Sequence, residues 1–288
     1  MSGRHGVGAD DDLHAADLAS LLDLEVLERG DGVTVFLGRV RALGADWPVL
    51  YGGQVAAQSL IAAGSTVPEG RRPHSLHGYF LRPGRIDRKV QFRVDHDRDG
   101  RSYSARHVSA MQDGRVIFSM LASFVEHETP SVLDDVPVRA SAARGPDECP
   151  AHPVDPHIDA RAITSRDEFD GRHLEPDALW VRVPTAMPAD PLTQAAVLTY
   201  LSDLGSGFGQ VEDPEVGIGG PSLDHALWFH EPIATDEWLL LDMWPVAAVK
   251  GRGVYHGTLR DRSGRLGVMI AQENLLRTYF IDERGSTA

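Results

Sequence analysis

Five residues in the second half of the chain carry side chains that could do chemistry. Asp203 follows an apolar stretch, Ser222 and the pair Asp224–His225 open another, and Gln272 lies within a third. A carboxylate can act as a general base, while hydroxyl and amide groups can orient a water molecule. Judged by residue type alone, Asp203 could equally be a solvated carboxylate on a helix. Gln272 could equally be a polar side chain on the outer face of its strand. Asp224–His225 fits best as a strand pair that supports Asp203 or the nearby helix end.

The histidines and arginines elsewhere in the chain do not predict a second functional site. His74 and His77 lie in one predicted strand without a third ligand at metal spacing, so we expect no metal and no cofactor. Arg82, Arg101 and Arg106 could meet phosphate groups, although strand arginines are more often solvated.

Composition narrows the class of protein. The chain has 288 residues, 42% of them hydrophobic, and a formal net charge of -14. An acidic surface disfavours nucleic acid, which needs a basic face. No apolar run reaches the roughly 20 residues of a membrane helix. The single cysteine, Cys149, cannot form an internal disulfide, and the N-terminus lacks an apolar signal segment, so we expect a cytoplasmic protein.

The chain repeats itself at an interval of about 150 residues, a sign of duplication. Four landmarks recur at separations of 147, 149, 151 and 150 positions: Ser75 and Ser222, Pro83 and Pro232, Gly100 and Gly251, Gly114 and Gly264.

Each repeat predicts the same elements. Residues 90–97 alternate apolar and polar, which is typical of a half-buried antiparallel strand, and Asp99–Gly100 and Asp113–Gly114 predict hairpin turns. In the second repeat we expect strands at 237–249, 253–262 and 265–277. Residues 53–64 predict an apolar helix with Gly64 as its C-cap. Asp190–Pro191 predicts the start of a second helix, which reaches about residue 204.

An apolar helix wrapped by a curved antiparallel sheet is the hotdog arrangement. We therefore predict an α+β double hotdog, with two tandem units that each hold a long buried helix. The expected organisation is a disordered tail at 1–17, an N-terminal hotdog domain at 18–126, a proline-rich linker at 127–159, and a C-terminal hotdog domain at 160–282.

Six stretches, in this order, resemble the bacterial and peroxisomal acyl-CoA thioesterase II family. They are YGGQVAAQSL (51–60), HSLHGYFLRPG (74–84), DGRSYSARHVSAMQDG (99–114), YLSDL (200–204), SLDHALWFHEP (222–232) and AQENLLR (271–277). The resemblance covers roughly residues 18–280. It implies a tandem hotdog fold and hydrolysis of fatty acyl-CoA to free fatty acid and CoA.

The resemblance also assigns the catalytic residues, which hold a nucleophilic water without a metal or a covalent intermediate. By position they are Asp203, Ser222 and Gln272, with Ser222 standing where many members have threonine. At an offset of about 150, Asp203 corresponds to Gly53 or Gln54, Gln272 to Ala122, and Ser222 to Ser75. The first half therefore lacks the carboxylate and the amide, and we expect one active site per chain.

Two alternatives stay open at this point. One is a hotdog enoyl-CoA hydratase or dehydratase, which would need a histidine near the helix aspartate; none follows Asp203 before Pro221. The other is a non-catalytic acyl-CoA-binding module. Exposed sheet edges lead us to expect a homo-oligomer.

Overall fold

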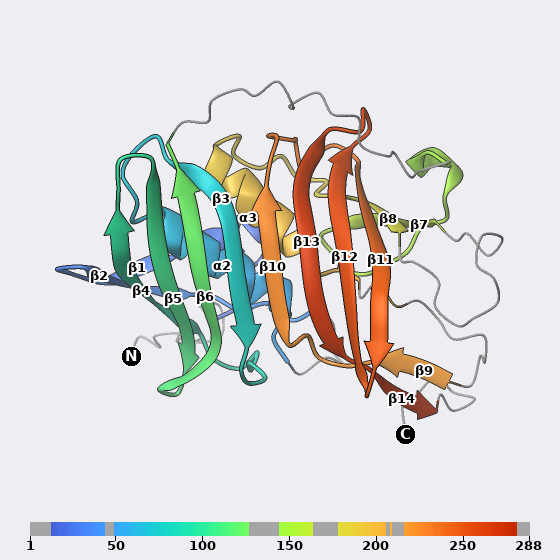
Figure 1. The fold of residues 1–288 in the computed structure, drawn as a ribbon, viewed down its shortest axis with the longest axis horizontal. Coiled ribbons are helices and arrows are strands. Elements are labelled where there is room, and N and C mark those ends of the chain that lie inside the picture. Colours follow the sequence, from blue (N-terminus) through green and yellow to red (C-terminus); the bar gives the residue numbers. More distant parts are fainter. Residues whose placement is uncertain are drawn as a thin grey trace, which may run out of the picture.

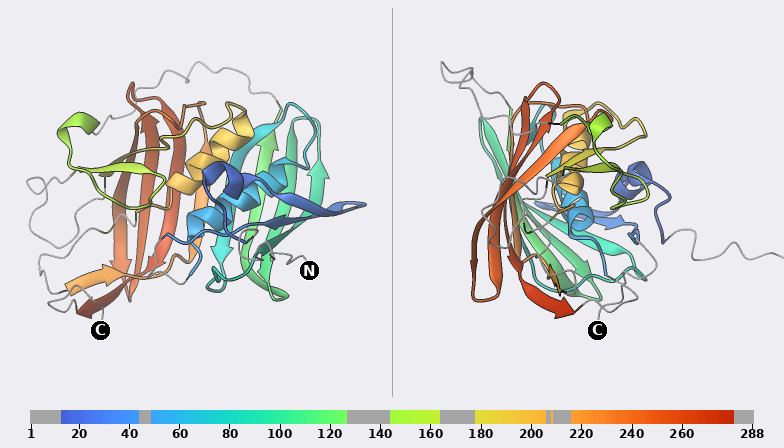
Figure 2. Two further views of the ribbon diagram at one scale, coloured as in Figure 1. Left: turned by 180° about the vertical axis from the view of Figure 1, so that it is seen from behind. Right: turned by 90° about the vertical axis from the view of Figure 1, so that its right-hand side faces the viewer.

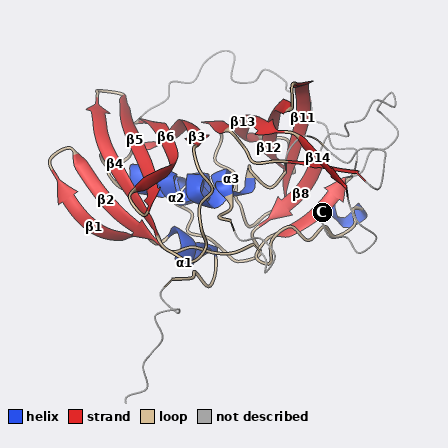
Figure 3. Ribbon diagram, turned by 90° about the horizontal axis from the view of Figure 1, so that it is seen from below, coloured by secondary structure: helices blue, strands red, loops and turns tan. Residues whose placement is uncertain are grey.

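The computed structural model describes residues 13–43, 49–126, 144–163, 178–205, 208 and 216–280. Its main layer is a twelve-stranded sheet in the order β1-β2-β4-β5-β6-β3-β10-β13-β12-β11-β8-β7 (Figure 1). The paired strands are antiparallel, and β9 pairs with β14 in a separate small sheet. Helices α2 and α3 cover the concave side of the main sheet (Figures 2 and 3).

In chain order the elements are α1 (Leu18–Leu22), β1 (Glu25–Gly30), β2 (Val33–Gly38), α2 (Gly52–Gly64), β3 (Arg72–Phe80), β4 (Val90–Asp99), β5 (Tyr103–Gln112), β6 (Arg115–Val125), the 3-10 helix η1 (Pro146–Glu148), β7 (Asp159–Ile163), β8 (Ala178–Arg182), α3 (Pro191–Leu201), β9 (Val216–Gly219), β10 (Asp224–Phe229), β11 (Leu239–Val249), β12 (Arg252–Asp261), β13 (Leu266–Leu275) and β14 (Arg277–Phe280).

The sequence repeat appears in space as a repeated strand order. Outward from the centre, the first half runs β3, β6, β5, β4, and the second runs β10, β13, β12, β11. Strands β4 and β11 begin at Val90 and Leu239, 149 positions apart, and β6 and β13 begin at Arg115 and Leu266, 151 positions apart. The two halves therefore meet at the β3–β10 pair, which joins them into one continuous sheet.

Helix α2 is buried along nearly its whole length, as its small apolar residues predict. The amide nitrogen of its polar Gln58 is satisfied inside the protein, because Nε2 donates to the carbonyls of Leu21 and Arg39 at 2.9 and 2.8 Å. The expected C-cap at Gly64 is wrong. Ser65 caps the helix, and Gly64 lies inside it, where an added Cβ would come within 2.3 Å of Leu192 on α3.

Helix α3 begins as its sequence predicts. The Asp190 side chain accepts a hydrogen bond from the Thr193 N–H at 2.9 Å, and Pro191 occupies the first turn, where its missing N–H costs nothing. The helix ends at Leu201, which leaves Asp203 just beyond its last turn.

The segments outside the two repeats are partly described. Residues 13–17, expected within the tail, are folded: Ala15 is buried and donates its N–H to the Val40 carbonyl, and Asp17 caps α1. In the proline-rich segment, Cys149 packs against Trp180, Trp238 and Leu240 on the second half. No helix among the described residues is long and apolar enough to cross a membrane.

The seam between the halves is apolar on its inner face, where Leu227 of β10 lies opposite Leu76 of β3 and both are fully buried. We expect Leu227→Ala to destabilise the whole chain by about 2–5 kcal/mol, the usual cost of a buried leucine. Leu121→Ala, at an exposed site on β6, should change stability by less than about 0.5 kcal/mol. Urea unfolding measures both. Equal midpoints for the two variants would contradict this description of the seam.

Candidate active site

The polar cluster lies where the end of α3 meets the start of α2. The Tyr51 hydroxyl donates to the Tyr200 carbonyl at 2.7 Å, and the two rings pack edge to face. Gly52 and Gly53 allow this approach: a Cβ on Gly52 would lie 2.7 Å from the Asp203 carboxylate, and one on Gly53 would lie 2.7 Å from the Tyr200 carbonyl oxygen. The glycine pair therefore brings the first N–H groups of α2 against Asp203.

Asp203 uses both carboxylate oxygens. Oδ2 accepts the Gly53 N–H at 2.8 Å, and Oδ1 accepts Gln272 Nε2 at 3.0 Å. The Ser222 hydroxyl lies 3.5 Å from the same Oδ1. The three residues expected to hold a water, which span 69 positions of sequence, are thus within hydrogen-bond reach of one another.

Gln272 is the hub of the cluster. Besides Asp203, its Nε2 reaches Ser222 Oγ at 2.7 Å and Asn274 Oδ1 at 3.1 Å. On the other side of the amide, Oε1 contacts Nδ1 of His225. His225 is fully buried, and its Nε2 lies 2.8 Å from the hydroxyl of Ser202, the C-cap of α3. The expectation that His225 supports the helix end agrees with this contact.

Burial controls the charges in the cluster. It raises the pKa of Asp203, and the nearby His225 together with the Gln272, Gly53 and Ser222 hydrogen bonds offsets only part of that rise. Burial also lowers the pKa of His225, an effect that Asp203 and Gln272 oppose. Burial thus makes the Asp203 carboxylate more basic than that of an exposed aspartate, and it favours the neutral form of the His225 imidazole.

The correspondence of Asp203 with Gly53 or Gln54 is wrong. The helices begin at Gly52 and Pro191, 139 positions apart, rather than about 150 like the strands. The loops after the helices differ in length, so a constant offset fails there. Asp203, two residues beyond the end of α3, corresponds to Thr66, two beyond the end of α2. Gly53 is instead the hydrogen-bond partner of Asp203. Residue type alone predicts neither this contact nor the contact between Asn274 and Gln272.

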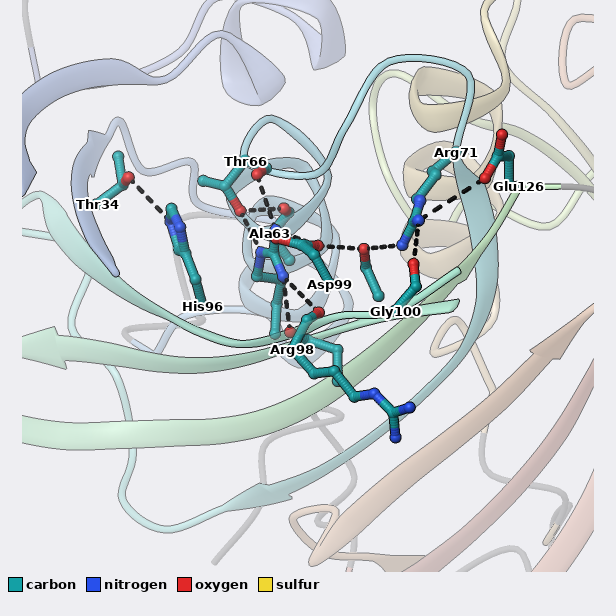
Figure 4. A network of polar contacts seen from close by, with 12 residues as sticks. Thr34, Ala63, Thr66, Arg71, His96, Arg98, Asp99, Gly100 and Glu126 are labelled. Atoms are coloured by element: carbon teal, nitrogen blue, oxygen red, sulfur yellow. Dashed lines mark hydrogen bonds and ion pairs between the residues drawn. The ribbon is translucent and has the colours of Figure 1, made fainter. Parts of the chain in front are cut away.

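Arg106, one of the three arginines considered for phosphate binding, has a structural role. Its guanidinium is completely buried and pairs with Asp99 at 2.9 Å, and it also donates to the hydroxyl and carbonyl of Thr66 (Figure 4). The network continues through Ser104 to Arg71. Arg106 thus connects the end of α2 to the β4–β5 hairpin. It does so at Thr66, the residue that corresponds to Asp203.

Two further observations concern the described residues outside the polar cluster. Among the described residues, no three His, Cys, Asp or Glu side chains gather as a metal site. A hollow of about 450 Å³, lined by Arg98, Arg101, Tyr103 and their neighbours, lies at the tip of the β4–β5 hairpin. That tip adjoins the start of β3, whereas Asp203 lies near its end at Phe80, so the hollow is separate from the polar cluster.

Comparisons with known proteins cover both halves. The profile of the acyl-CoA thioesterase N-terminal domain matches residues 43–125, and that of the acyl-CoA thioesterase C-terminal domain matches residues 133–276. Human acyl-coenzyme A thioesterase 8 is 30% identical over 92% of this chain and 90% of its own length. The chain belongs to the acyl-CoA thioesterase II family.

Solved structures agree with this family. The acyl-CoA thioesterase II TesB2 of Mycobacterium marinum has a TM-score of 0.73 and 34% identity, over 90% of this chain and 96% of that one. A hotdog-fold protein of Alicyclobacillus acidocaldarius has a TM-score of 0.67 at 22% identity, over 90% and 97% of the two chains, which bears on the fold alone. As a member of the family, the chain is a thioester hydrolase with a hotdog-type antiparallel sheet.

The raised pKa of Asp203 predicts how this thioesterase responds to pH. A carboxyl whose folded pKa lies above its unfolded value stabilises the fold at low pH and loses that contribution as pH rises through the folded pKa. We therefore expect the unfolding free energy of the wild type, minus that of Asp203→Asn, to fall as pH rises above about 4, the ordinary pKa of an aspartate. Urea unfolding at several pH values measures it. A difference that is constant, or that rises with pH, would contradict the buried carboxylate.

Proposed function

We propose that this chain hydrolyses fatty acyl-CoA thioesters to free fatty acid and CoA, by direct attack of a water held by Asp203, Ser222 and Gln272. The observation that carries the proposal is the hydrogen-bonded cluster in which Asp203 Oδ1, Ser222 Oγ and Gln272 Nε2 converge. Two tandem hotdog units, joined along β3 and β10, supply the frame.

Asp203 is the general base in this mechanism. Its carboxylate takes a proton from the water as the oxygen attacks the thioester carbonyl, and the carbon–sulfur bond then breaks to release CoA as a thiol once that proton is returned. Burial supports the role, because a raised pKa makes the carboxylate a stronger base at neutral pH. Gln272 and Ser222 orient the water toward the carbonyl.

A covalent route through Ser222 has less support. A serine nucleophile is usually activated by an adjacent histidine, and the only carboxylate that the Ser222 hydroxyl meets in this cluster, Asp203, lies 3.5 Å away, at the limit of a hydrogen bond. The histidine of this cluster has its ring nitrogens against Ser202 and Gln272, and the Ser222 hydroxyl faces Asp203 and Gln272. We therefore assign Ser222 to the water and not to an acyl-enzyme.

The alternatives differ in their products. A hydratase would use Asp203 with a histidine facing the substrate, yet both nitrogens of His225 are engaged inside the protein. A non-catalytic acyl-CoA-binding module would release no thiol. A thiol-release assay across acyl chain lengths separates the thioesterase from both alternatives, which release no thiol, and also gives the length preference. The cytoplasmic location, the homo-oligomer and the domain boundaries stay predictions.

The mechanism predicts the effect of removing the base. Asp203→Asn should lower kcat by about 10²–10⁴-fold with little change in acyl-CoA binding, because Asn keeps the size but cannot accept the proton. Asp190→Asn is the matched control: it changes an aspartate at the other end of α3, where Asn caps equally well, and should leave kcat unchanged. Thiol release under saturating acyl-CoA measures both. Wild-type turnover by Asp203→Asn would refute the assignment.

The proposed roles of Ser222 and Gln272 predict a graded loss of activity in their variants. Ser222→Thr should keep most activity, since threonine presents the same oxygen, whereas Ser222→Ala should lose it. Gln272→Ala should cost as much as Asp203→Asn or somewhat less, because it removes orientation and not basicity. Intact mass after an acid quench is the second readout. An acyl group retained on the wild-type protein would contradict direct attack by water.

A further inference from the structure

We infer that His225 is a positioning residue: its Nδ1–H holds the Gln272 amide in the one orientation that presents N–H donors to Asp203 and Ser222. This inference rests on the proposed function and identifies a residue outside the water-holding set.

The Gln272 amide is surrounded by oxygen atoms on one side. Asp203 Oδ1, Ser222 Oγ and Asn274 Oδ1 lie 3.0, 2.7 and 3.1 Å from its nitrogen. In the flipped orientation the amide oxygen would face the same three oxygens, two of which can only accept. A glutamine that is 2% exposed cannot relieve this repulsion by turning to solvent.

The opposite side of the amide decides which orientation is held. There the Gln272 oxygen contacts Nδ1 of His225, and an amide oxygen can only accept. The contact is therefore a hydrogen bond only when Nδ1 carries a proton. Both the neutral Nδ1–H form and the imidazolium satisfy this requirement, and only the neutral Nε2–H form does not. The argument thus depends on which nitrogen is protonated and not on the charge of the ring.

Ser202 completes the arrangement. With a proton on Nδ1 of a neutral His225, Nε2 needs a donor, and the Ser202 hydroxyl lies 2.8 Å away. The same hydroxyl lies 2.8 Å from the Thr199 carbonyl, so the imidazole and the helix carbonyl compete for its one hydrogen. Because Ser202 adjoins Asp203, the end of α3 both presents the carboxylate and contacts the histidine that orients the Gln272 amide.

The first half of the chain shows what this position holds when no site is present. The offset of the Ser75–Ser222 pair would match His225 to Gly78, but the strand ends match it to Leu76, because each stands four residues before the end of its strand, β10 or β3. Gln272 stands three before the end of β13, and Ala122 three before the end of β6. Leu76 and Ala122 lie opposite each other and are fully buried. The same strand positions can therefore be occupied by an apolar pair, and the fold does not require the His225–Gln272 pair for its stability.

The test compares His225→Leu, which copies the first half, with His225→Asn, whose amide N–H falls near the position of Nδ1–H. His225→Leu should lower kcat about 10-fold to 100-fold, as expected when a buried hydrogen bond is lost, with little change in KM. His225→Asn should recover most of kcat. His77→Leu, on the exposed face of the neighbouring β3, is the control and should behave as wild type. Folded His225→Leu with wild-type kcat, or His225→Asn as inactive as His225→Leu, would overturn the inference.

A second readout needs neither turnover nor the leucine variant. In protein with ¹⁵N-labelled histidine, the His225 signals, assigned by their loss in His225→Asn, should show a protonated Nδ1 and an unprotonated Nε2 at neutral pH. Ser202→Ala should weaken this preference. A protonated Nε2 with a bare Nδ1 would overturn the inference even if the leucine variant does not fold. Failure of the proposed function would give a different result from failure of this inference. The wild type would then release no thiol from acyl-CoA, and the tautomer measurement would still test the role of His225.

Discussion

The structure depends on burying one carboxylate among hydrogen-bond donors. Burial disfavours the charged form of Asp203, and the fold opposes this with the Gly53 N–H in the first turn of α2, an amide and a hydroxyl. None of the three is local in sequence. The need for the helix N–H explains why two glycines open α2, and the contact between Tyr51 and Tyr200 holds the helix ends together. The donors only partly compensate for burial, which leaves Asp203 basic enough to act.

The two halves of the sheet have related strand orders, and they meet along β3 and β10. In each half the residue two positions beyond the helix contacts a strand of the same half: Asp203 contacts Gln272 of β13, and Thr66 contacts Arg106 of β5. In the second half this place holds Asp203, His225 and Gln272. In the first it holds Thr66, Leu76 and Ala122, and Arg106 anchors the helix end to Asp99. The second half thus carries the proposed active site, whereas the equivalent place in the first half is a packed junction.

Much of the fold could be predicted from the sequence because its signals are local. Alternating residues marked the strands, the Asp190–Pro191 pair marked the start of α3, and the recurring turns marked the repeat. The contacts of the site were harder, because they join residues up to 150 positions apart. A constant offset placed Gly53 opposite Asp203 as its equivalent, since loop lengths differ between the halves. The resemblance selected Asp203, Ser222 and Gln272, whereas the histidine contact required coordinates.

The central claim is that Asp203 activates a water and does not attack the thioester itself. A single turnover of acyl-CoA by excess wild-type enzyme in H₂¹⁸O, followed by mass spectrometry of the product and of the peptide that contains Asp203, tests it most directly. Attack by water places one ¹⁸O in the fatty acid and none in Asp203. An anhydride formed on Asp203 and opened by water at the aspartyl carbon would place ¹⁸O in Asp203 and leave the fatty acid unlabelled. That second result would contradict the account.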